Sequence, residues 1–343
     1  MAAPANRRTL VRGALALVAV AALALVATAV ALAAFAARAD HSGEIVTAVP
    51  DFTAPAITAT AVGKSAGGAT GFVKQGGSYY AYAAVAADTG NPPSGIASVK
   101  ANVETLTTGQ AAVAMEAGSF PAGGSTYNYR AGPLTANATL AEGAKSFAVT
   151  SADVAGNTKA ANGAVTVDNT PPQAADIQTT NAGTNGLAEQ NDTVVYTVSE
   201  PVEPESILGG WSGTATNVVV RIYDNGLLGL PLGDDELVVY NAANTAELPL
   251  GKVDLGRGDY VSGLLGGQIT FGASGTASKM TMSGNTVTIV LGTYAAVGLV
   301  VGRSTAAGTG TMTWTPVATP IDRAGNVMST APATEAGPAD RDF

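Results

Sequence analysis

The sequence predicts an all-β protein: antiparallel β-sandwiches that follow an N-terminal apolar helix. Three observations lead to this fold class. Short apolar segments alternate with turn residues over most of the chain, 42 glycines and 17 prolines interrupt any long helical pattern, and one unbroken apolar run lies close to the N-terminus. Since β-branched residues favour strands and Gly and Pro favour turns, we expect strands and turns rather than helices beyond that run.

The apolar run predicts a membrane-spanning helix within residues 1–39. It covers 25 residues, Gly13–Ala37, and follows Arg7, Arg8 and Arg12. As a helix it would span about 37 Å, more than the roughly 30 Å of a bilayer core. Because positive charge favours the cytoplasmic side, the N-terminal region is expected in the cytoplasm and the rest of the chain outside the cell. The membrane is therefore one expected partner, through residues 13–37.

The same region also fits a secretory signal that is removed. Residues 34–36 (Ala-Phe-Ala) and 37–39 (Ala-Arg-Ala) both have the small-x-small pattern of a cleavage site. The protein would then be secreted instead of being a single-pass membrane protein. A mature N-terminus at Arg38 or Asp40, measured by mass, would identify cleavage.

Composition beyond residue 39 excludes several functions. This part has 26 acidic and 13 basic residues, a net charge of −13, and no cluster of Lys and Arg, so nucleic acid is not an expected partner. No cysteine is present, which excludes disulfides, thiolate nucleophiles and cysteine metal sites. The single histidine, His41, adjoins the predicted membrane segment, so the folded domains have no catalytic triad. We expect no enzyme and no cofactor other than calcium.

Repeated turn motifs divide the rest of the chain. Asp51-Phe-Thr-Ala-Pro and Asp168-Asn-Thr-Pro-Pro each precede a strand-rich unit, and Asp153-Val-Ala-Gly-Asn near the end of the first unit matches Asp322-Arg-Ala-Gly-Asn near the end of the second. In each D-x-x-G-N motif the Asp side chain is expected to accept hydrogen bonds from the following backbone N–H groups. The predicted organisation is a stalk (40–51), a first domain (52–170), a second domain (171–331) and a polar tail (332–343).

Each unit contains several candidate strands. Those of the first unit are Ala56–Val62, Tyr79–Ala87, Ile96–Glu104, Thr126–Ala131, Lys145–Ala152 and Ala164–Val167. The second unit is larger than the roughly 100 residues of a simple sandwich, which indicates an insertion around residues 225–284. It is expected as a hairpin or accessory sheet, with a ligand-binding elaboration as the alternative. Candidate strands there are Val194–Val198 at the start, Val218–Tyr223 before the insertion, and Leu237–Tyr240 and Gln268–Phe271 within it.

Four short motifs carry a resemblance to a known family. They are the D-x-x-G-N turn, V-x-V-D-x-T-P at Val165–Pro171, Ser94–Val99, and Val194–Val202, which ends in S-E-P-V. Together they resemble the tandem Ig-like domains of bacterial surface-layer and adhesin proteins. The resemblance implies two Ig-like sandwiches, the second enlarged, and a role as spacer, scaffold or adhesive module.

Two groups of acidic and amide residues are candidate calcium ligands, because calcium prefers oxygen ligands. One is Asp234, Asp235 and Glu236, with Asp224 and Asp254 nearby in the sequence; the alternative is a solvated loop. The other consists of residues that would meet at one end of the first sandwich, where turn formation is the alternative explanation: Asp88, Asn91, Asp153 and Asn157.

The sequence thus favours a non-catalytic cell-surface structural or adhesive protein that binds extracellular protein or glycan. A secreted calcium- or carbohydrate-binding module is the alternative. A carboxylate-dependent glycosidase is a third hypothesis, since such enzymes need only two carboxyl groups, but no pair stands out by motif. Trp211 and Trp314 are expected in the core, although an exposed Trp would stack on sugar rings.

Overall fold

The computed structural model describes residues 51–64, 68–225, 233–263, 267–297 and 301–343. Within these ranges the protein is all-β, as predicted, with several mainly antiparallel sheets and one four-residue helix, α2 (Pro204–Ile207). No helix of the described residues is long and apolar enough to span a membrane. The predicted membrane segment and nearly all of the predicted stalk lie outside the described residues.

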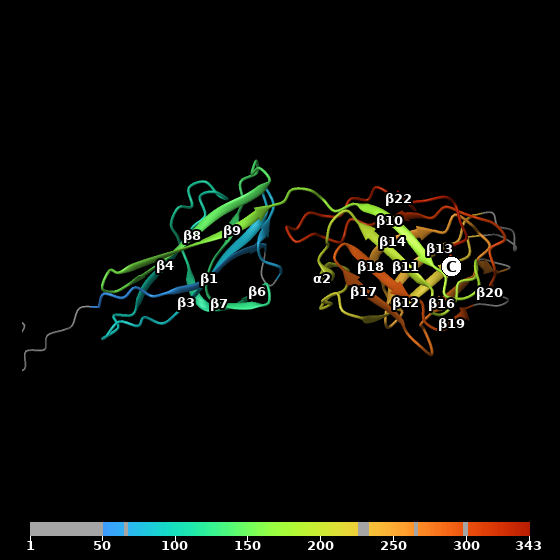
Figure 1. Ribbon diagram of the computed structural model, residues 1–343, viewed down its shortest axis with the longest axis horizontal. Coiled ribbons are helices and arrows are strands. Elements are labelled where there is room, and N and C mark those ends of the chain that lie inside the picture. Colours follow the sequence, from blue (N-terminus) through green and yellow to red (C-terminus); the bar gives the residue numbers. More distant parts are fainter. Residues whose placement is uncertain (1–50, 65–67, 226–232, 264–266, 298–300) are drawn as a thin grey trace, which may run out of the picture. The chain divides into compact units, whose positions relative to one another are not determined.

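The first unit is a sandwich of two sheets (Figure 1). One sheet has the order β1-β3-β7-β6, formed by β1 (Ile57–Lys64), β3 (Ser78–Val85), β7 (Ser125–Thr135) and β6 (Glu116–Ala122). The other has the order β2-β9-β8-β4-β5, formed by β2 (Phe72–Val73), β9 (Thr158–Val167), β8 (Gly143–Asp153), β4 (Ile96–Asn102) and β5 (Val113–Ala114). All six strands predicted here are confirmed, and among the described residues of this unit only β2 with β9 pairs in parallel.

Strand β8 shows how the sequence pattern builds this sandwich. Phe147, Val149, Ser151 and Asp153 alternate along the strand and are all buried, because successive side chains of a strand point to opposite faces. The two apolar residues join a core cluster with side chains of the other sheet. At the end of the strand the same face turns polar: the Ser151 hydroxyl donates to the carbonyl oxygen of Pro55 at 2.6 Å, and Asp153 enters a turn. Strand β8 therefore places the Asp153 carboxylate at one end of the sandwich.

The second unit contains one nearly closed, barrel-like sheet. Its strands follow the order β10-β11-β18-β17-β12-β13-β14-β21-β22; β16 also pairs with β12, and β19 pairs with β16. The strands are β10 (Ala174–Thr180), β11 (Thr193–Val198), β12 (Thr216–Tyr223), β13 (Glu236–Asn241), β14 (Glu247–Asp254), β16 (Gln268–Phe271), β17 (Ser278–Ser283), β18 (Thr286–Val290), β19 (Tyr294–Val297), β21 (Thr313–Thr315) and β22 (Ala333–Thr334). A separate pair consists of β15 (Val261–Ser262) and β20 (Gly302–Arg303).

The ends of this sheet approach each other. Just after β22, the backbone N–H of Ala336 donates to Asp176 Oδ1 of β10 at 2.8 Å, and Gln178 Nε2 of β10 donates to the Ala336 carbonyl oxygen at 3.0 Å. These side-chain hydrogen bonds stand where a backbone ladder would close the sheet. We call the whole barrel-like sheet, from β10 to β22, the curved sheet.

Apart from the short strand β15, the strands of the insertion do not form an accessory sheet. Strands β13, β14 and β16 all belong to the curved sheet, and β12 pairs with β13 along one edge and with β17 and β16 in succession along the other. Strand β12 thus pairs along both of its edges, and its three valines and Ile222 are all buried.

Residues 332–343 also differ from the predicted polar tail. They contain β22, which pairs with β21, and Phe343 is completely buried against Tyr260 with ring centroids 5.8 Å apart. The sequence did not predict this packing because β22 has only two residues, too few to show a strand period.

Candidate cation sites

The two D-x-x-G-N motifs form the same turn in both units. In the first, Asp153 Oδ1 accepts the backbone N–H of Asn157 at 2.7 Å and Oδ2 accepts the Asn157 side-chain amide at 2.8 Å. In the second, Asp322 Oδ1 accepts the backbone N–H of Asn326 at 2.8 Å and Oδ2 accepts its side-chain amide at 2.7 Å. Gly156 and Gly325 both have φ of 92°, where glycine is favoured. The predicted turn chemistry is confirmed.

The second turn places its Asp in a cluster of three carboxylates. Asp168, Glu200 and Asp322 each offer an oxygen, and these atoms all lie within 4.8 Å of one another. Asp168 comes from the segment between β9 and β10, Glu200 follows β11, and Asp322 begins the turn. Burial, together with the neighbouring charges of Asp168 and Asp322, raises the pKa of Glu200 to about 7. Three carboxylates this close repel one another unless a proton or a cation lies between them.

The first unit repeats two members of this cluster. Asp88 follows β3 as Glu200 follows β11, and Asp153 occupies the position of Asp322. The carboxylates of Asp88 and Asp153 lie within 4.8 Å of each other, as predicted for one end of the sandwich. Asp88 Oδ2 accepts the backbone N–H of Gly95 at 2.8 Å, and Asn157 contributes its amide to the turn. Asp153 thus forms the predicted turn and also places its carboxylate close to that of Asp88.

The other predicted group does not form a three-carboxylate cluster within the described residues. Asp235 is 0% exposed, and its Oδ2 accepts the backbone N–H groups of Tyr260 at 2.9 Å and Val261 at 2.8 Å. Glu236 forms an ion pair with Lys252, and Asp234 is exposed. Among the residues that the structure describes, none of these three belongs to a three-carboxylate cluster, nor do Asp224 and Asp254.

Asp235 instead fixes a buried loop, and this gives a pH prediction. Burial raises its pKa to about 7, with Asp224 and Asp259 adding repulsion. Since the folded-state pKa exceeds the unfolded value near 4, the folded state binds the extra proton, and the free energy of unfolding falls as pH rises from about 4 to about 7. Its contribution is on the order of 1 kcal/mol per pH unit.

Urea unfolding at several pH values, with chelator present, measures this dependence. Asp235→Asn is expected to unfold with a shallower slope over the same window, because it cannot titrate. Equal slopes for the two proteins would contradict the assignment.

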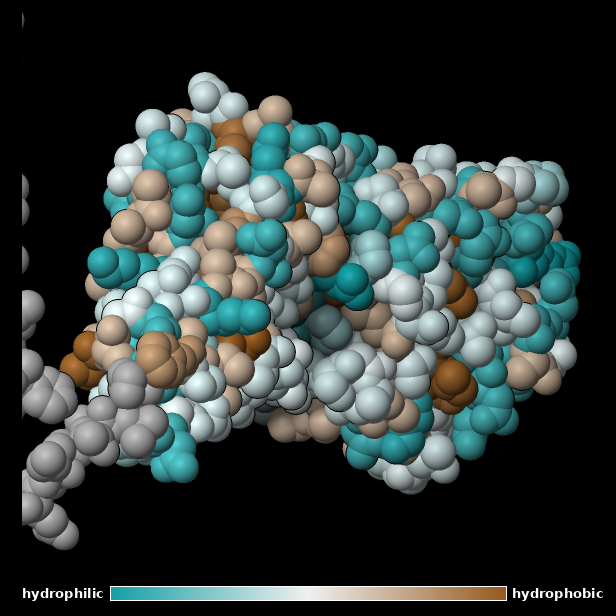
Figure 2. All heavy atoms as spheres, turned by 60° about the vertical axis from the view of Figure 1, so that its left-hand side comes forward, coloured by the Kyte–Doolittle hydropathy of each residue, from teal (hydrophilic) through white to brown (hydrophobic). Residues whose placement is uncertain are grey.

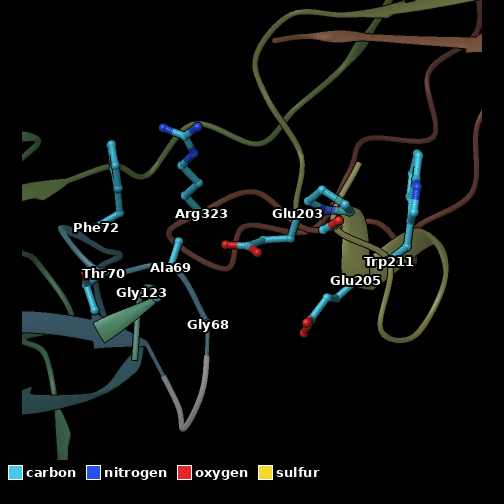
Figure 3. A pocket seen from close by; sticks show the side chains of 12 residues that line it. Gly68, Ala69, Thr70, Phe72, Gly123, Glu203, Glu205, Trp211 and Arg323 are labelled. Atoms are coloured by element: carbon cyan, nitrogen blue, oxygen red, sulfur yellow. The ribbon is translucent and has the colours of Figure 1, made fainter. Parts of the chain in front are cut away.

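Both tryptophans lie in the core, as predicted. Trp314 is 1% exposed, its Nε1 donates to the Leu250 carbonyl oxygen at 2.6 Å, and its ring meets Tyr196 edge-on. Trp211 is also buried, and its Nε1 donates to the Thr214 carbonyl oxygen at 2.6 Å. Figure 3 shows Trp211 on the loop after α2, near Glu205. Neither ring is available as an exposed platform for sugar stacking.

The turn and strand motifs of the sequence contain Asp168, Glu200 and Asp322, but these motifs do not predict the three residues as ligands. The signal that could have found them is the repeat itself: an acid before the first strand, an acid after the next strand, and the Asp of D-x-x-G-N. No known protein-family model matches the sequence, and no curated protein matches it.

Proposed function

We propose that this chain is a non-catalytic structural or adhesive protein of the cell surface, built from Ig-like modules. The observation that carries the proposal is the strand order of the first sandwich. If β1, β3, β6 and β7 are strands A, B, D and E, their sheet has the order A-B-E-D. With β4, β8 and β9 as C, F and G, the second sheet contains G-F-C, which is the order of an Ig-like sandwich.

The second unit supports the same interpretation. The run β10-β11-β18-β17 again reads A-B-E-D in chain order, with strands β12 to β16 inserted between B and D. The repeated D-x-x-G-N turns agree with this correspondence. We propose that the second unit is an enlarged form of the same module.

The acidic surface and the N-terminal apolar segment support an exported protein. The segment would anchor the modules as a single-pass membrane protein, or they would be secreted after its removal. Figure 2 shows hydrophilic and apolar residues interspersed on the face in view. In the described part of the chain the exposed large apolar residues are Phe52, Val154, Val317 and Val327.

Cell fractionation, the mass of the mature N-terminus, and binding of the full chain to arrays of glycans and extracellular proteins test this proposal. We expect the modules outside the cell and, for an adhesive role, saturable binding without turnover. A purely structural role predicts surface retention without such binding. Cytoplasmic location, or catalytic cleavage of any polysaccharide on the array, would contradict the proposal.

Calcium binding is a second candidate function, favoured by the carboxylate cluster at Asp168, Glu200 and Asp322. Oxygens within 4.8 Å of one another fit the 2.3–2.6 Å ligand distances of calcium. Calcium at about 100 times its Kd would raise the melting temperature of the full chain by several degrees.

Substitution of Glu200 tests this site. Glu200→Gln removes one carboxylate while keeping its size, so we expect it to lose one equivalent of calcium in titration calorimetry. Glu205→Gln, an exposed residue of α2 outside the cluster, is the matched control and should bind as the natural protein does. Equal calcium stoichiometry in all three proteins would contradict the site.

A further inference from the structure

A second carboxylate cluster follows β22 in the second unit. Glu335, Asp340 and Asp342 each offer an oxygen, and these atoms all lie within 4.8 Å of one another. Asp342 is 1% exposed and Glu335 8%, whereas Asp340 is exposed. The cluster is thus an enclosed site with one side open to solvent. None of these residues was singled out in the sequence, because they lie in the stretch predicted to be a polar tail.

Neighbouring groups hold two members of the cluster in place. Asp342 Oδ1 accepts the hydroxyl of Thr179 on β10 at 3.2 Å, and its Oδ2 accepts the hydroxyl of Tyr260 at 3.3 Å. The Asp342 backbone N–H donates back to the Tyr260 hydroxyl oxygen at 3.0 Å. The backbone N–H of Glu335 donates to the Met312 carbonyl oxygen at 3.0 Å. These contacts fix the positions of Asp342 and of the Glu335 backbone before any ligand binds.

One buried carboxylate oxygen has no partner. Glu335 Oε1 is closed off from solvent, and no hydrogen-bond donor contacts it. Across the described ranges, no Lys or Arg forms an ion pair with Glu335, Asp340 or Asp342. An unpaired buried charge costs several kcal/mol unless a proton or a cation neutralises it.

We propose that Glu335, Asp340 and Asp342 form a divalent-cation site that binds calcium. The donors are all carboxylate oxygens, which calcium prefers, and their mutual separation suits its 2.3–2.6 Å ligand distances. The unpartnered Glu335 oxygen supplies a ligand that is already stripped of water. Exposed Asp340 provides the path of entry and leaves room for water ligands.

Binding at this site would fasten the two ends of the curved sheet. Asp342 already contacts Thr179 on β10, and Glu335 directly follows β22. A cation between Asp342 and Glu335 therefore ties the segment after β22 to β10, where the backbone ladder does not close. This inference is independent of the Asp168–Glu200–Asp322 site, because the two clusters share no residue.

Terbium luminescence and calorimetry on the full chain in detergent test the proposal. Tyr260 contacts Asp342, so terbium bound here should show tyrosine-sensitised emission that calcium displaces. Glu335→Gln should lose this emission and one equivalent of calcium, whereas Glu200→Gln and the control Glu205→Gln should keep the emission. If only Glu200→Gln failed to lose calcium, the Asp168–Glu200–Asp322 site would be contradicted and the present site would not. If only Glu335→Gln failed to lose calcium, the present site would be contradicted and the other would not.

A stability measurement separates a cation site from a structural carboxylate. In chelator, Glu335→Gln should melt at or above the temperature of the natural protein, because it removes a repelling buried charge. With calcium at about 100 times its Kd, the natural protein should gain roughly 5–10 °C, and the variant should lose the part of the gain that this site supplies. An equal calcium gain in both proteins, or sensitised emission that survives Glu335→Gln, would overturn the proposal.

Discussion

Replacing Trp314 by alanine is expected to lower the free energy of unfolding by about 3–5 kcal/mol. The side chain is 1% exposed on β21, and its ring packs edge-on against Tyr196 with centroids 5.1 Å apart. The substitution removes this contact, leaves a cavity in the core of the second unit, and deprives the Leu250 carbonyl oxygen of its 2.6 Å hydrogen bond. Urea or thermal unfolding measures the loss.

Trp314→Phe separates packing from hydrogen bonding. Phenylalanine keeps much of the ring but lacks the indole N–H, so the Leu250 carbonyl oxygen loses its donor at a cost of about 1–3 kcal/mol. The expected order of stability is Trp, then Phe, then Ala. An alanine variant within 1 kcal/mol of the natural protein would contradict the central position of this residue.

Replacing Phe343 by alanine is expected to cost a similar amount, about 3–5 kcal/mol. Phe343 is completely buried and packs edge-on against Tyr260. Its carbonyl oxygen accepts the backbone N–H of Gly186 at 2.6 Å, which links this residue to the loop after β10. If residues 332–343 were a solvated tail, the same substitution would change stability by less than about 0.5 kcal/mol.

Phe52 provides the matched control for this prediction. It is 80% exposed, so Phe52→Ala should change the free energy of unfolding by less than about 0.5 kcal/mol. A Phe343→Ala variant that unfolds like Phe52→Ala would show that the buried position of Phe343 contributes nothing to stability. Guanidinium unfolding of both variants, followed by tryptophan fluorescence, makes the comparison.

Local patterns predicted the first unit well. Alternating burial in β8 and the turn chemistry of Asp153 both depend on residues that are near one another in the sequence. Strand β6 and the short strands β2 and β5 were not predicted; β2 and β5 have only two residues each, too few to show a strand period. Their pairing with β9 and β4 is set by the arrangement of the longer strands.

The second unit was harder to predict, since its sheet depends on pairings between distant segments. Val218–Tyr223 and Gln268–Phe271 were expected as strands and are strands, but nothing in either segment shows that they pair with each other. The burial of Asp235 was missed for a related reason, because its partners Tyr260 and Val261 follow it by 25 and 26 residues. The carboxylate clusters likewise assemble from distant turns.

The near-closure of the curved sheet has a consequence for the order of folding. Ala336 contacts Asp176, 160 positions earlier, so the loop that must close is much longer than one formed by a hairpin. Contacts between such distant residues are reached late and slow the folding reaction, because chain entropy is lost before the contact is gained. The strands of the first sandwich all end before residue 170, whereas the last strand of the curved sheet, β22, is Ala333–Thr334. We therefore expect the first unit to acquire its structure before the second.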